Sequence, residues 1–300
     1  MIRYPGDRDI YRQAGEKAIP APVLIRDVVR VVEVLNLKAK QFFGTKSVLA
    51  GSMALRCFGS PRFTVYDADF STTSATVHPE TRMQKLLDYS DRSLTIEAAP
   101  LVPSAEEGSI WKCAPVRYTP AFTALAPDAA DRTFKADVSF RGLVEDGQER
   151  QLLLPYDLDI WLDDDAPTVF VMNPHEIMAE KILGWCADRQ VKHYADLAFI
   201  AVVSNPEART RVIDIDYSHA RNVLDAKLQI MSGVHPAKYA RFPTIDSLIA
   251  DLGQPPVFDA ADWRKIMYIR DHRDRFTQSF IQRAVQGIIV PRLRAAGVGR

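Results

Sequence analysis

Two aspartates spaced two residues apart follow a glycine-serine turn near residue 50. Gly51-Ser52 ends an apolar run that begins at Val48, and Asp67-Ala68-Asp69 lies in a second strand-like run. Because successive side chains of a strand point to opposite faces, Asp67 and Asp69 share one face, roughly 6–7 Å apart. Two such carboxylates can hold divalent ions, and a Gly-Ser turn can offer backbone N–H groups to phosphate. The combination predicts nucleotide chemistry.

A later strand supplies a third carboxylate. From Phe134 to Phe140 apolar side chains alternate with Lys135, Asp137 and Ser139. Taken alone, this stretch is more typical of an edge strand with a solvated polar face. The order of the motifs, a Gly-Ser turn, then Asp-x-Asp, then a strand aspartate, favours a site in which Asp137 joins the first two carboxylates.

A second Asp-x-Asp competes with the first. Asp157 and Asp159 flank Leu158, but no Gly-Ser turn precedes them, and three consecutive aspartates follow at 163–165. Consecutive aspartates are typical of a solvated turn. We therefore rank this pair below Asp67 and Asp69.

Two charged residues lie in apolar helices of the second half. Asn173-Pro174 is a strong helix start, and the helix should run to about Asp188 with Lys181 on its apolar face. Lys181 is either functional or a snorkelling lysine whose head reaches water. Asp196 lies inside a helix expected from Lys192 to about Val203 and needs a partner, because burying a lone carboxylate is costly. Lys181 is a plausible partner.

The remaining pattern predicts the fold that positions these residues. A helix is expected from Ala21-Pro22 to about Phe43, strands at 94–98, 110–118 and 133–140, and a last helix from 260 to 295 that breaks near Pro291. Helices dominate from residue 173. We predict an α+β protein with a mixed-sheet catalytic domain at 1–171 and a helical domain at 172–300 that contributes Lys181 and Asp196 to the cleft.

Composition limits the class of protein. The formal net charge of the 300 residues is zero, so a nucleic-acid site must come from a local patch such as the arginine-rich stretch 259–300. Cys57, Cys113 and Cys186 show no C-x-x-C spacing and indicate reduced thiols. No apolar run reaches the length of a membrane span, and the amino terminus lacks the apolar core of a signal peptide. We expect a cytoplasmic protein without membrane contact.

These residue types suit nucleotidyl transfer from a nucleoside triphosphate (NTP). Magnesium, or manganese, prefers oxygen ligands, so carboxylates on adjacent strands can hold it without histidine or cysteine. A lysine can approach the triphosphate as a mobile point charge. We predict as catalytic residues Asp67, Asp69, Asp137, Lys181 and Asp196, as nucleotide-binding residues Gly51, Ser52 and Lys181, and as metal ligands Asp67, Asp69 and Asp137.

The motifs resemble a known family. The Gly-Ser and Asp-x-Asp pair is similar to the first motif of the DNA polymerase β-like nucleotidyltransferase superfamily. The whole series resembles the AbiEii-type toxins of type IV toxin–antitoxin and abortive-infection systems, which include mycobacterial nucleotidyltransferase toxins. The later motifs of the series are Lys135-Ala136-Asp137-Val138, Glu180-Lys181-Ile182 and Tyr194-Ala195-Asp196-Leu197. Ala50 stands where that family usually has a second glycine, and Lys192-His193 where it usually has Arg-Asp.

The resemblance implies a function. It implies a magnesium-dependent toxin that transfers a nucleoside monophosphate from an NTP to RNA, in particular to the 3′ end of tRNA, blocks translation and is neutralised by a cognate antitoxin. A second interpretation keeps the site and changes the acceptor to a protein hydroxyl or a small molecule such as an aminoglycoside. A third is a non-catalytic module that binds RNA or nucleotide through the basic carboxy-terminal helices.

Overall fold

The chain divides into two compact units. They are Met1–Met172, here called the sheet unit, and Asn173–Arg300, here called the helical unit. The computed structural model describes residues 25–43, 47–60, 62, 67–72, 88–91, 94–98, 102–103, 110–120, 133–139, 142, 145–152, 167–205, 212–259, 262 and 277–298. The competing pair Asp157 and Asp159, the expected helix start at Ala21-Pro22 and most of the stretch 260–276 lie outside these residues.

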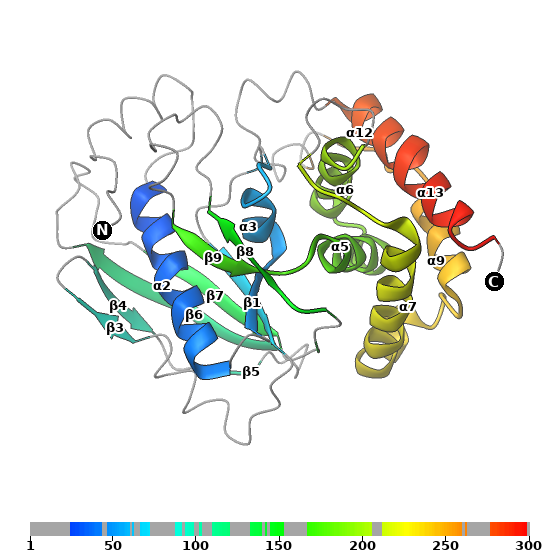
Figure 1. The fold of residues 1–300 in the computed structure, drawn as a ribbon. Coiled ribbons are helices and arrows are strands. Elements are labelled where there is room, and N and C mark those ends of the chain that lie inside the picture. Colours follow the sequence, from blue (N-terminus) through cyan, green and yellow to red (C-terminus); the bar gives the residue numbers. More distant parts are fainter. Residues whose placement is uncertain are drawn as a thin grey trace. The chain divides into compact units, whose positions relative to one another are not determined.

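The sheet unit is a mixed sheet with two described helices (Figure 1). The helices are α2 (Ile25–Phe43) and α3 (Gly51–Arg56). The strands are β1 (Ser47–Ala50), β2 (Asp67–Thr72), β3 (Tyr89–Ser90), β4 (Leu94–Ala98), β5 (Val102–Pro103), β6 (Ile110–Pro120), β7 (Thr133–Ser139), β8 (Gln148–Gln151) and β9 (Thr168–Val171).

Among the described residues, the strands form one sheet in the order β3-β4-β6-β7-β2-β1-β9-β8, and β5 pairs with β6. The β2–β7 and β1–β9 pairs are parallel, and the other pairs are antiparallel. Strand β7 therefore lies inside the sheet between β6 and β2, and the edge-strand interpretation of 134–140 is wrong. The mixed sheet confirms the α+β prediction.

The two faces of β2 differ in burial and in polarity. Ala68 and Phe70 are each 1% exposed, whereas Asp67 and Asp69 between them are only partly buried. Helix α2 packs on β1, β9 and β2 through a row of buried side chains that includes Val31 and Leu35, both fully buried. Burial of aliphatic side chains at helical spacing is the main force that holds such a helix on a sheet.

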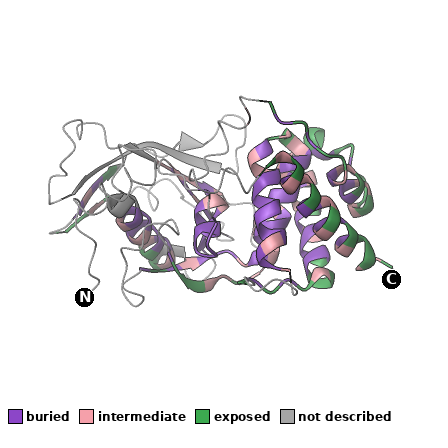
Figure 2. Ribbon diagram, turned by 90° about the horizontal axis from the view of Figure 1, so that it is seen from above, coloured by how far each residue is buried: buried purple, intermediate pink, exposed green. Residues whose placement is uncertain are grey.

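The helical unit is built around α5 (Pro174–Asp188) and α6 (Val191–Val203). Most residues of α5 and α6 are buried, whereas the outer helices of this unit carry both buried and exposed residues (Figure 2). The remaining elements are α7 (Tyr217–Val234), α8 (Pro236–Tyr239), α9 (Ile245–Leu252), α12 (Gln278–Ala284), the π-helical turn η3 (Val285–Ile289) and α13 (Val290–Ala295). Among the described residues, no helix has both the length and the hydropathy that a membrane span needs.

Local signals in the sequence explain the bounds of α5. The Asn173 side chain caps the helix by accepting a hydrogen bond from the His175 N–H at 3.1 Å, and Pro174 occupies the first turn. Arg189, with a φ of 54°, ends the helix in the left-handed region. The helix has the extent that the sequence predicts.

The carboxy-terminal helix differs from its prediction. The chain is extended at Thr277, whose hydroxyl accepts a hydrogen bond from the Phe280 N–H, so a new helix begins there. Pro291 lies within α13 and does not break it. Because proline lacks an N–H and its ring crowds the carbonyl of Gly287 four residues earlier, the preceding turn widens into the π-helical turn η3.

Candidate active site

Two neighbouring strands place three carboxylates on one polar face of the sheet. Asp69 of β2 is the register partner of Asp137 of β7, and Asp67 is the partner of Lys135. Register partners on adjacent strands lie about 4.8 Å apart and share a face. The parallel β2–β7 pairing therefore brings Asp67, Asp69 and Asp137 together, although nearly 70 residues separate the two motifs.

Lys135 is part of this acidic face. Its ammonium lies 2.7 Å from Asp137 Oδ2, with the lysine side chain 45% and the aspartate side chain 16% exposed. The other carboxylate oxygen, Asp137 Oδ1, is buried and has no hydrogen-bond partner. One oxygen of Asp137 is thus held by an ammonium and the other is available to a cation.

The pKa of Lys135 reports the charge of the whole cluster. Partial burial alone would lower this pKa, but the hydrogen bond and the charge of Asp137 oppose that effect. The carboxylates of Asp69 and Asp67 add to the opposition, and the net effect raises the pKa. The ammonium is therefore stabilised by all three carboxylates.

The Gly51 turn lies against the same cluster. Gly51 has a φ of 65°, and a Cβ atom at this position would lie 2.1 Å from Asp69 Oδ2. Ala50, just before the turn, is the register partner of Asp69 on the other side of β2. Only glycine allows both the left-handed backbone and this approach. Ser52 follows at the start of α3 and is half-buried.

The chemistry of these donors fits a divalent cation. Magnesium and manganese take carboxylate oxygens, and a buried carboxylate oxygen without a partner is costly unless a cation or donor satisfies it. The three carboxylates are not among the described groups whose ligand atoms all lie within 4.8 Å of one another. Asp67, Asp69 and Asp137 would have to turn toward one another to share an ion.

In the helical unit, Lys181 and Asp196 form a buried ion pair. Lys181 Nζ lies 2.8 Å from Asp196 Oδ2, and the side chains are 7% and 2% exposed. Lys181 is therefore held by a carboxylate and does not extend into water as a snorkelling lysine would. Helices α5 and α6 supply the two residues, as the sequence predicts.

Sequence reasoning missed a second buried ion pair on α5. Glu176 is fully buried, and its Oε1 lies 2.6 Å from Nζ of Lys227 on α7, which is 2% exposed. Glu180, 34% exposed, lies 3.1 Å from the same ammonium. The spacing of Glu176 and Glu180 by one helical turn was the available signal, but their partner lies about 50 residues away. Helix α5 thus forms one buried ion pair with α6 and another with α7.

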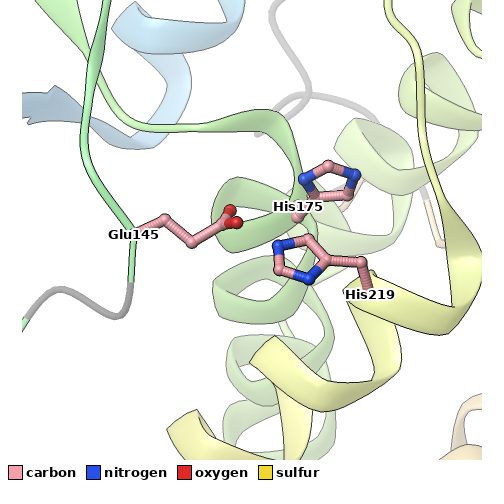
Figure 3. Close-up of side chains that lie close together, drawn as sticks. All are labelled: Glu145, His175 and His219. Atoms are coloured by element: carbon pink, nitrogen blue, oxygen red, sulfur yellow. The ribbon is translucent and has the colours of Figure 1, made fainter.

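Two histidines join the amino-terminal ends of α5 and α7. Figure 3 shows the rings of His175 and His219, which meet edge to face with centroids 4.9 Å apart. His175 Nε2 accepts a hydrogen bond at 3.2 Å from the N–H of Asp216, the residue that caps α7. This contact fixes the helix that carries Lys227 relative to the helix that carries Lys181.

The carboxylate face and the glycine turn of the mixed sheet supply the groups that nucleotidyl transfer would use. The family model described as "Nucleotidyl transferase AbiEii toxin, Type IV TA system" matches residues 35–280. The chain therefore belongs to the AbiEii family of nucleotidyltransferase toxins, as its motifs predict.

The likeness to one solved structure, MenT4, supports the fold. MenT4, a nucleotidyltransferase toxin from Mycobacterium tuberculosis H37Rv, superposes with a TM-score of 0.53 at 17% identity, covering 92% of this chain and 98% of that chain. JHP933 from Helicobacter pylori gives a TM-score of 0.42 at 16% identity, covering 90% and 94%. Among curated proteins, none matches.

Proposed function

We propose that this toxin transfers a nucleoside monophosphate from an NTP to the 3′ end of tRNA and thereby blocks translation. The observation that carries the transfer chemistry is the cross-strand pair of Asp69 and Asp137, with Asp67 on the same face and the Gly51 turn beside it. The tRNA acceptor is the expectation that follows from the resemblance to AbiEii-type toxins. A cognate antitoxin is expected because the family description names a type IV toxin–antitoxin system.

The predicted site residues of the sheet unit each have a role in this proposal. The attacking hydroxyl loses its proton to solvent and its oxygen bonds to the α-phosphorus, while the bond from the α-phosphorus to the oxygen bridging the β-phosphate breaks and pyrophosphate leaves. Divalent magnesium or manganese at the carboxylates would supply positive charge to the triphosphate and activate the hydroxyl. Asp67 and Asp69 would bind the divalent ion. Asp137 would bind it through Oδ1, beside the attacking hydroxyl. The Gly51 turn and the Ser52 hydroxyl would bind phosphate oxygens.

Lys181 is the proposed triphosphate-binding cation of the helical unit. Asp196 would hold its ammonium in one position, since the two groups are 2.8 Å apart and almost fully buried. A fixed ammonium loses less entropy on binding an anion than a mobile one does. Asp196 is thus proposed to act through Lys181 and not on the nucleotide.

Labelling of total RNA tests the proposed acceptor. Purified protein is incubated with each α-labelled NTP in turn, with magnesium or with EDTA, and with total RNA whose 3′ ends are intact or oxidised by periodate. We expect label in tRNA-sized species only with intact ends and magnesium. Label in protein, or label that survives periodate oxidation, would contradict the tRNA 3′ end as acceptor. Absence of any labelled product from folded protein would contradict transfer itself.

A further inference from the structure

Lys135 places a positive charge beside the three carboxylates of the sheet unit. It is the register partner of Asp67, and its ammonium lies 2.7 Å from Asp137 Oδ2. Asp69 adds its charge from the neighbouring position on β2. A single ammonium therefore neutralises part of the negative charge that a divalent ion would otherwise neutralise.

The pair between Lys135 and Asp137 is easily broken. The lysine side chain is 45% exposed and has a long flexible stem, so the ammonium can move into water at little cost. The three carboxylates do not converge on one point, and one oxygen of Asp137 is occupied by the lysine. A divalent ion at this cluster would repel an ammonium within hydrogen-bond distance of one of its ligands.

We propose that Lys135 is a tethered counter-cation that holds Asp137 until a divalent ion binds, and that binding of the ion displaces its ammonium. The inference rests on the proposed function, because it takes Asp67, Asp69 and Asp137 as the metal ligands. It adds a competition between the Lys135 ammonium and the divalent ion for the Asp137 carboxylate, which the family motifs do not describe. Removing the lysine charge should therefore tighten metal binding, because no internal cation has to leave.

Calorimetric titration with Mn²⁺ in the absence of nucleotide tests this competition. The full chain is compared with Lys135→Met, which removes the charge but keeps the stem, and with Lys135→Arg, which keeps the charge. Lys40→Met is the matched control, because Lys40 pairs with Glu149 at 2.8 Å, is 36% exposed and belongs to the same unit. Asp69→Asn reports whether the measured site is the carboxylate cluster.

Lys135→Met should lower the dissociation constant for Mn²⁺ by about two- to fivefold, the factor expected from releasing one exposed ion pair. Lys135→Arg and Lys40→Met should bind as the unmodified protein does. Lys135→Gln gives a second neutral variant should Lys135→Met fail to fold. Unchanged or weaker binding by the neutral variants, with binding still lost in Asp69→Asn, would overturn the role of Lys135 alone. Absence of Mn²⁺ binding to the unmodified protein would overturn both this role and the proposed metal site.

Discussion

The substitution Gly51→Ala should displace the Asp69 carboxylate without removing its charge. The added Cβ would lie 2.1 Å from Asp69 Oδ2, whereas real Cβ contacts essentially never fall below 3.0 Å. The carboxylate must therefore move by about 0.9 Å or more while its charge and its strand remain in place. A misplacement of about 1 Å in a catalytic site costs roughly 100-fold in rate.

The effect on stability should be smaller than the effect on rate. A non-glycine residue at a φ of 65° costs about 1–2 kcal/mol. For a unit of this size, that corresponds to a fall in melting temperature of about 2–8 °C. We therefore expect a folded protein whose single-turnover transfer of label from an NTP is slower by about two orders of magnitude. Thermal melting and transfer are measured on the same preparation.

Gly233→Ala is the matched control for this substitution. Gly233 lies in α7, and a Cβ there would meet nothing within 4 Å. The control should transfer at the unmodified rate and melt at the same or a slightly higher temperature, because alanine favours helix more than glycine does. Transfer by Gly51→Ala within threefold of the unmodified rate would show that the reaction does not depend on the position of the Asp69 carboxylate.

The two buried ion pairs on α5 give the remaining predictions. Lys227→Met should lower the free energy of unfolding by about 3–5 kcal/mol, because it leaves the carboxylate of Glu176 buried without its cation. The double variant Lys227→Met with Glu176→Gln should recover most of that stability and transfer label normally; a double variant as unstable as the single one would contradict this account of the pair. Lys181→Met should be destabilising for the same reason, and adding Asp196→Asn should restore the melting temperature without restoring transfer. Transfer at the unmodified rate by this second double variant would show that the lysine has no part in the reaction.

Local signals in the sequence were enough to predict much of the fold. The alternation around Asp67 and Asp69 gave the strand and its polar face, and the Asn173-Pro174 start gave α5 with its bounds. Such signals depend on neighbours within one strand or one helical turn, which the sequence shows directly. The motif order also placed the chain in its family.

Contacts between segments that are far apart in the chain could not be predicted from the sequence. The alternation of β7 does not show that the strand lies between β6 and β2 and not at an edge. No local signal pairs Glu176 with Lys227, because the packing of α7 on α5 buries the two residues together. Lys135 shares a face with Asp137 in the sequence pattern, yet its nearness to the carboxylates of β2 depends on the parallel register.

We propose that the carboxylates of β2 and β7 perform nucleotidyl transfer. The most direct test is single-turnover transfer of label from NTP to RNA by Asp69→Asn, compared with the unmodified protein at matched melting temperature. Because Asp69→Asn keeps the size of a partly buried side chain, we expect this variant to melt within a few degrees of the unmodified protein and to transfer no measurable label. Transfer at an unchanged rate by a folded Asp69→Asn variant would show that the Asp69 carboxylate takes no part in the reaction.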